Sequence, residues 1–184
     1  MENFYSIVEN YKNKNIEEIL NKSLKLFSEQ GLQKVSFNQI ADECNIGVAS
    51  LYRYFKNKKT LINECAIYHL SKIVEEIKPK VNSIQFLNKK AIEELEELLN
   101  YYIKFYKENK TFLKFLSEFD NYIMYNKMDK QKEFDYNQLY KSFYYIAKKI
   151  YKKGLIDNSI RDDFEFDSFY YSVSSALWIF TSIT

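Results

Sequence analysis

Apolar residues recur at steps of three and four along most of the sequence, which is the spacing of a helix with one buried face. The first clear stripe contains Ile16, Ile19, Leu20, Leu24 and Phe27. Gly31 follows where helices commonly end, because glycine readily adopts the left-handed conformation of a C-cap. We therefore expect a helix through this stripe that ends at Gly31.

Two short helices are expected next. Ser36 and Gln39 have the spacing of a capping box, in which each side chain bonds the backbone N–H of the other residue. The helix that they begin should end near Asn45, since asparagine tolerates a left-handed turn. Gly47 then opens a second short helix over roughly residues 47–54.

The rest of the chain continues the helical pattern. Asn57 is expected to cap a long helix that ends near Ile77, where Pro79 would stop it. Gly154 is expected to end a later helix, and Asp162 with Glu165 to begin the last one. The other apolar runs predict helices through residues 92–103, 112–123, 134–150 and about 163–184.

The composition supports an all-α fold. The 184 residues include only three Gly and one Pro, whereas a fold of many tight turns needs more of both. The net charge is only +2, but residues 47–60 carry four basic side chains and no acid. Such a patch suits phosphate groups. A solvated charged face is the alternative reading of the charge by itself.

The stretch SFNQIADECNIGVASLYRYFKNKKTL, residues 36–61, has the pattern of a helix-turn-helix. Its apolar positions would lock both helices against the first one (Ile40, Ala41, Ile46, Leu51 and Phe55). The second helix would then expose small residues at its start, where bases are approached closely in the major groove. Its tyrosines, with the neighbouring lysines, would hold phosphates; ordinary core packing is the alternative for Tyr52 and Tyr54.

LYRYFKNKKTL and the preceding IADECNIGVASLY resemble the DNA-binding domain of TetR-family regulators, over roughly residues 14–65. This resemblance implies an all-α fold with an N-terminal arm (1–13), a three-helix DNA-binding domain (14–60, motif 36–55) and a helical effector-binding and dimerisation domain (61–184). It also implies a homodimeric repressor that binds double-stranded operator DNA and is released by a small-molecule effector. The alternative is a helical ligand-binding or adaptor protein without operator binding.

The resemblance also assigns roles to single residues. Ser36 and Asn38 would face DNA, Tyr52 and Tyr54 would press on the sugar-phosphate backbone, and Lys58 would bind a phosphate at a helix N-terminus. The base edges would meet Val48, Ala49 and Ser50. Many family members carry Lys where this chain has Val48 and Gly where it has Ala49, so the base preference does not transfer.

The body should supply a dimer surface and an effector pocket. One helix-turn-helix makes few contacts, and a dimer reads two half-sites. The last two long helices carry apolar stripes that are candidates for the dimer contact (Phe143, Ile146, Ile150, Phe169, Val173, Ala176 and Phe180). The alternative is that these stripes pack within one monomer. The middle helices are rich in aromatics that could line a pocket, or form plain core (Tyr102, Phe105, Tyr106, Phe112, Phe115, Phe119 and Tyr122).

Other chemistry has little support in the sequence. Because the sequence has one histidine and three glycines, we expect no enzymatic activity, no metal site and no cofactor. No sequence pattern singles out a Lys/Glu pair for acid–base catalysis. His69 reads as a surface or satisfied histidine, and Cys44 and Cys65 as buried apolar residues rather than redox sensors. No apolar run is long enough to span a membrane and no signal peptide is evident, so a reduced cytoplasmic location is expected.

Overall fold

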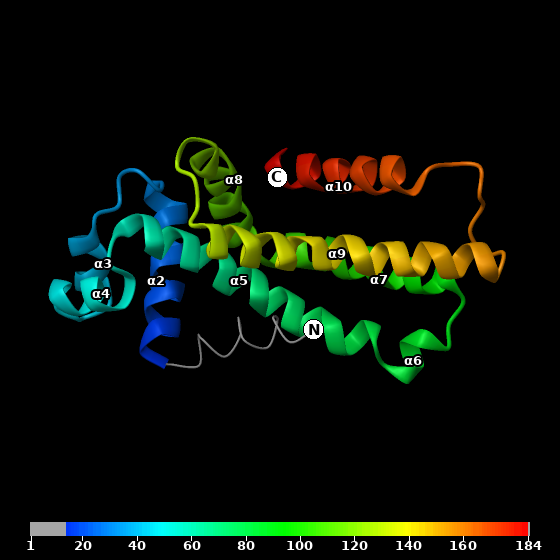
Figure 1. Ribbon diagram of the computed structural model, residues 1–184, viewed down its shortest axis with the longest axis horizontal. Coiled ribbons are helices and arrows are strands. Elements are labelled where there is room, and N and C mark those ends of the chain that lie inside the picture. The colour runs from blue at the N-terminus through cyan, green and yellow to red at the C-terminus, as the bar shows by residue number, and fades with distance from the viewer. Residues whose placement is uncertain (1–13, 184) are drawn as a thin grey trace. The chain divides into compact units, whose positions relative to one another are not determined.

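The described chain is entirely helical apart from its connections (Figure 1). The computed structural model describes residues 14–183, and side chains as far as residue 177; the expected N-terminal arm, residues 1–13, lies outside this part. This confirms the all-α fold class. The helices are α2 (Lys14–Gln30), α3 (Phe37–Glu43), α4 (Val48–Phe55), α5 (Lys58–Val81), α6 (Ile84–Leu87), α7 (Ala91–Glu108), α8 (Lys110–Tyr125), α9 (Lys130–Ile156) and α10 (Phe166–Ile183).

The chain packs into two compact units. The first contains the chain up to Ile73 together with Thr111–Leu139, and the second contains Val74–Lys110 together with the chain from Tyr140 onward. Helices α5 and α9 therefore contribute residues to both units. Compactness reports packing only, so the functional division that the sequence suggests at residue 60 stays a prediction.

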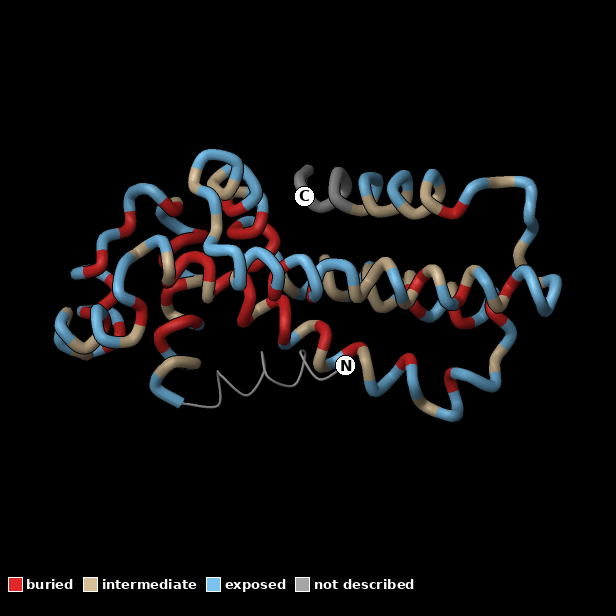
Figure 2. Tube along the Cα trace, viewed as in Figure 1, coloured by how far each residue is buried: buried red, intermediate tan, exposed pale blue. Residues whose placement is uncertain are grey.

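The first unit has a core of aliphatic and aromatic side chains. The stripe of α2 buries Ile19, Leu20 and Phe27, and the first half of α5 is buried over several turns (Figure 2). The Phe27 ring lies 6.1 Å from that of Phe115 on α8, which stacks in turn on Phe119 at 5.8 Å. Burial of one such side chain contributes roughly 1.5–3 kcal/mol, so α8 is held firmly against α2.

The second unit has its own core. It gathers residues from the end of α5, from α6, α7 and α9, and from the start of α10 (Ile77, Val81, Phe86, Ala91, Leu98, Ala147, Ile150 and Phe166). The short helix α6, which the sequence pattern did not indicate, is capped by Ser83 and buries Phe86.

Pro79 does not end the long helix, as the sequence suggested; α5 continues to Val81. A proline this close to the C-terminus removes a single backbone donor, while its fixed φ still suits a helix. Burial of Ile77 and Val81 favours the added turn, and Asn82 completes it by donating from its backbone N–H and its side chain to the carbonyl of Lys78.

Gly154 also lies inside its helix, because α9 runs on to Ile156. The left-handed residue after this helix is Asn158, with φ 57°. A Cβ at Gly154 would lie 2.7 Å from Cβ of Ile160 and closer still to its Cδ1. The glycine is therefore needed for close packing of the returning chain, and its assignment as a helix end was wrong.

The capping pair expected at Asp162 is wrong as well. Helix α10 begins at Phe166, so Glu165 occupies the position just before it. The backbone carbonyl of Glu165 accepts from the N–H of Phe169, and its carboxylate accepts from the hydroxyl of Ser168. Burial of Phe166 in the second core sets this start, rather than the local acidic pattern.

His69 is largely buried in the first unit, with its Nε2 3.4 Å from the carbonyl oxygen of Leu20. Its ring lies 5.8 Å from that of Phe112. Desolvation lowers the pKa of His69 to about 4, so the folded protein holds the neutral imidazole in its core at neutral pH. This agrees with the expectation of a satisfied histidine.

The neutral His69 makes stability depend on pH. The unfolded chain takes up a proton near pH 6.5, whereas the folded chain takes it up only near pH 4. The free energy of unfolding should therefore fall as pH falls between these values, by up to about 3 kcal/mol. Urea unfolding at a series of pH values should show this slope in the wild type and lose it in His69→Gln. Equal slopes for the two proteins would contradict this prediction.

Gly154→Ala should destabilise the protein even though alanine is normally the better helix former. The new Cβ would force Ile160 and its backbone to shift, and such overpacking costs about 1–3 kcal/mol. Gly47→Ala is the matched control, since a Cβ there meets nothing within 4 Å. Its loss should come only from the weaker N-cap preference of alanine, about 0.5–1 kcal/mol. A Gly154→Ala protein as stable as the wild type in urea would refute the packing role.

Candidate nucleic-acid interface

Helix α3 is set by local hydrogen bonds at its first turn. The Ser36 hydroxyl accepts from the backbone N–H of Gln39 at 3.2 Å, and the Gln39 side chain accepts from the backbone N–H of Ser36 at 2.7 Å. This confirms the capping box. The helix buries Phe37 and Ile40 and leaves Ser36 and Asn38 exposed at its start, as a contact with an outside partner requires.

The turn between α3 and α4 is tight. Asn45 has φ 56°, the left-handed conformation that its place in the sequence indicated. The N–H of Ile46 reaches back to the carbonyl of Ala41 at 3.0 Å. Gly47 caps α4 with an ordinary φ of −66°, and space is open around its α-carbon. The backbone at Gly47 is thus open to an outside partner.

Helix α4 has one buried side and one exposed side. Leu51 and Phe55 are 0% and 3% exposed, which agrees with their expected place in the core. Val48 and Ser50 are half-buried and Ala49 is exposed, so only small side chains lie at the start of the helix. A second helix held in this way has the form of one that enters the major groove.

The two tyrosines of α4 differ in their surroundings. Tyr52 packs with its ring centre 4.8 Å from that of Phe37, yet 51% of the residue is exposed. Tyr54 is half-buried beneath the guanidinium of Arg53, 5.5 Å from the ring centre. Core packing therefore does not describe Tyr52, and both phenols remain candidates for backbone contacts.

The start of α5 adds positive charge. Asn57 caps this helix by accepting from the backbone N–H of Thr60 at 2.8 Å, and no acidic residue occupies the first turn. Lys58 donates to the carbonyl of Gln33 at 2.9 Å, which holds its ammonium group beside the α2–α3 connection. Partial burial lowers the pKa of Lys58, because desolvation disfavours the charged ammonium group. A nearby anion would offset this desolvation.

Four cations of this region have no described carboxylate partner. They are Arg53, Lys56, Lys58 and Lys59, and the backbone of Lys56 itself has φ 58° at the end of α4. Their charge is therefore available to an external anion, and the positive end of the α5 dipole adds to it. The geometry supports phosphate binding along this side of the helix-turn-helix.

The expected effector residues fall in both compact units. Phe112, Phe115 and Phe119 are buried in the core of the first unit, which also contains the half-buried Tyr122. The other members belong to the second unit (Tyr102, Phe105 and Tyr106). Since neither unit gathers the whole set, these residues as a single pocket stay a prediction.

The expected dimer residues also have different surroundings. On α9, Ile150 is buried in the second core, and Phe143 and Ile146 pack against that core. Much of this stripe is therefore already buried within the monomer. On α10, Phe169 and Val173 are half-buried and Ala176 is exposed. The side chain of Phe180 lies outside the described residues. The stripe on α10 therefore stays the better candidate for a dimer contact.

One feature of the second unit had no signal in the sequence. A cavity of about 310 Å³ is lined from α5, α6, α7 and α9, and includes Lys78 and Lys149. Four helices contribute to it, so no local motif could have indicated it.

The two cysteines do not form a disulfide, and both lie inside the fold. Cys44 and Cys65 are both buried and free, and burial raises the pKa of each thiol. No group of three or more His, Cys, Asp or Glu side chains among the described residues could hold a metal ion. Within the same residues, no helix is both long and apolar enough to span a membrane.

Comparison with solved structures supports the fold. FadR of Bacillus subtilis, a transcriptional regulator solved in complex with stearoyl-CoA, matches with a TM-score of 0.72 and 13% identity, over 91% of this chain and 85% of that one. The ketosteroid transcriptional regulator KstR2 of Mycobacterium tuberculosis matches with a TM-score of 0.72 and 18% identity, over 92% and 83%. At these identities the likeness concerns the fold.

Sequence relatives support the function. An HTH-type transcriptional regulator of Staphylococcus aureus (strain bovine RF122 / ET3-1) is 28% identical over 90% of this chain and 79% of its own length. Another, from strain USA300, is 32% identical over 69% of this chain and 66% of its own length. Residues 19–65, which include α3 and α4, match the family described as bacterial regulatory proteins, tetR family. This chain is therefore a helix-turn-helix transcriptional regulator of the tetR family.

Proposed function

We propose that this protein is a homodimeric repressor that binds operator DNA through α3 and α4 and is released by a small-molecule effector. The observation that carries the proposal is the exposed side of α4, with small residues at its start and cations without described carboxylate partners beside it. A repressor of a bacterial operator would act in the cytoplasm, where the operator lies. The contacts assigned to single residues are part of this proposal.

Helix α4 would lie in the major groove. The groove is about 12 Å wide and accepts one helix with its side chains. Val48, Ala49 and Ser50 would then meet base edges, because no long side chain holds the backbone away from them. The exposed part of Tyr52 suits a contact with the sugar-phosphate backbone, which positions the helix without reading sequence.

Ser36 and Asn38 would face DNA, and Lys58 would hold a phosphate beside the groove. Ser36 and Asn38 are exposed at the start of α3. Lys58 already lies beside the α2–α3 connection through its bond to Gln33, so its ammonium group needs little reorganisation to reach a phosphate.

An effector would act through the difference in its affinity for two arrangements of the protein. The fold neighbour FadR was solved with stearoyl-CoA, which supports a ligand-responsive body in this chain. A coupling of about 1–3 kcal/mol would lower operator affinity by about 5–150-fold. By linkage, operator DNA would lower effector affinity by the same factor.

Lys58→Ala should weaken binding to all DNA sequences alike. Loss of one phosphate contact should reduce the slope of log K against log salt by about one unit. The measurement is fluorescence anisotropy with DNA from upstream of the gene, and with a shuffled duplex, across a salt series. Lys114→Ala is the matched control, since Lys114 is exposed on α8 and lies outside the proposed interface.

Two outcomes of that experiment would contradict the proposal. Equal salt slopes for Lys58→Ala and Lys114→Ala would remove Lys58 from the phosphate contacts. A wild-type protein that binds neither duplex would favour a helical ligand-binding or adaptor protein instead.

Ala176→Asp should dissociate the dimer without unfolding the monomer. Ala176 is exposed in the single chain, so a carboxylate there costs little until a partner buries it. Ser175→Asp, also exposed but off the expected stripe, should leave the dimer intact. Sedimentation velocity measures the result, with circular dichroism as the check on folding. A fully dimeric Ala176→Asp protein would move the interface away from this stripe.

A further inference from the structure

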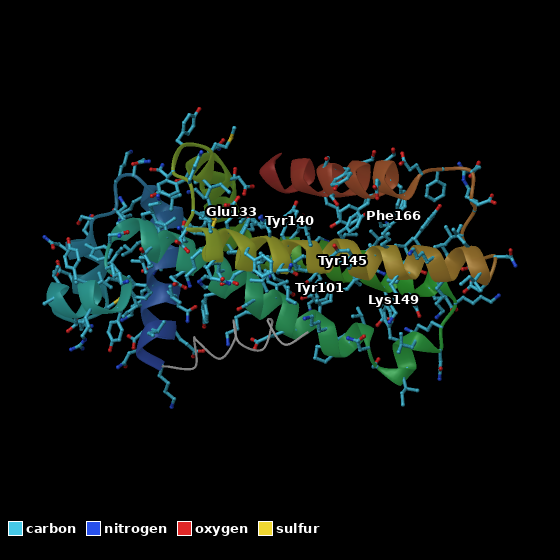
Figure 3. The ribbon with its side chains drawn as sticks, viewed as in Figure 1. Tyr101, Glu133, Tyr140, Tyr145, Lys149 and Phe166 are labelled. Carbon is cyan, nitrogen blue, oxygen red and sulfur yellow. The ribbon has the colours of Figure 1, made fainter. Side chains whose placement is uncertain are left out.

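The second unit contains a cavity of about 310 Å³ whose lining combines apolar and cationic side chains. It lies among the end of α5, the short helix α6, the start of α7 and the middle of α9. Tyr145 and Lys149, one helical turn apart on α9, both line it (Figure 3). Its volume is at the lower end of the range of small-molecule sites, about 300–1,000 Å³.

The floor of the cavity is apolar and well ordered by packing. Val81, Phe86 and Ile150 line it and belong to the buried core of the unit, and Ile146 lies beside them. These side chains come from three different helices, so the floor depends on the fold of the unit. An aliphatic or ring-shaped body of a ligand would find apolar surface here.

The acidic residue in the lining is already neutralised. The Glu94 side chain is only 3% exposed and forms an ion pair with Lys153. The Lys153 ammonium also donates to the carbonyl oxygens of Leu87 at 2.8 Å and Lys89 at 2.5 Å. This network satisfies both charges, so Glu94 does not oppose an anion and Lys153 is fixed as part of the wall.

The remaining charge of the lining is positive. Lys149 is exposed at the cavity, and no described residue forms an ion pair or hydrogen bond with its side chain. Lys78 lines the cavity from α5, and partial burial lowers its pKa. With Glu94 and Lys153 paired to each other, Lys149 supplies a positive charge at the cavity that no described carboxylate balances. A cation beside apolar surface gains from an anionic partner.

We propose that this cavity binds a small amphipathic carboxylate, with its apolar body on the floor and its carboxylate against Lys149. The assignment rests on the proposed function only for its biological role, that of effector site. The ligand class itself follows from the lining.

Calorimetric titration of the full chain with three probes that share an eight-carbon chain tests the ligand class. Octanoate should bind, and octyltrimethylammonium should bind at least about tenfold more weakly, because the lining repels a second cation. The affinity for octan-1-ol, which carries no charge, measures the contribution of the apolar floor alone. Wild-type protein that does not bind octanoate at millimolar concentration overturns the proposal.

Variants at Lys149 test the location. Lys149→Gln should weaken octanoate binding by about tenfold and leave octan-1-ol binding unchanged. Lys149→Glu should reverse the preference between octanoate and octyltrimethylammonium. Lys152→Gln is the matched control: Lys152 is exposed on the same helix but outside the cavity lining, so octanoate should bind as to wild type. Equal losses for Lys149→Gln and Lys152→Gln would overturn the assignment.

Two further readouts distinguish a carboxylate site from a contact between copies of the chain, and ligand binding from regulation. If octanoate does not bind and Lys149→Glu changes the sedimentation coefficient, the cavity is a contact between copies, and the carboxylate site is wrong. Operator affinity is measured in a separate assay. Octanoate that binds through Lys149 without changing operator affinity supports the ligand class and counts against effector regulation in the proposed function.

Discussion

Burial of Leu51 and Phe55 is the interaction on which the DNA-binding side of this protein depends. Helix α4 has only eight residues, too few to be stable alone in water. Its position is therefore set by those two side chains, which are almost completely removed from solvent. Once they are fixed, the opposite side of the helix must face outward. The exposure of Ala49 and Tyr52 follows from this packing.

The same principle separates structural from available charge. Lys153 is bound by a carboxylate and two carbonyl oxygens, so its charge is already balanced within the fold. The basic residues after α4, and Lys149 in the second unit, have no described carboxylate partner. A cation without a described carboxylate partner, beside a shaped surface, is the feature that both proposed binding sites share. One surface is a small-residue helix suited to DNA, and the other is an apolar cavity suited to a carboxylate.

Local signals in the sequence were reliable where the physical cause is local. The capping box of Ser36 and Gln39 and the left-handed turn at Asn45 involve residues only a few positions apart, so their sequence spacing suffices. Pro79 and Gly154 were misread because each was interpreted from its intrinsic preference. Packing of Val81 in the core, and of Ile160 against Gly154, outweighs those preferences.

The sequence alone determined the all-α class, the helix-turn-helix and its family, because periodicity and short motifs are written in neighbouring residues. The tertiary structure decided which aromatics share a core: Phe115 and Phe119 pack in the first unit, whereas Tyr102 belongs to the second. It also created the cavity at Lys149 from four helices. Neither result could be derived from the sequence, because contacts between residues far apart in the chain depend on how whole helices pack.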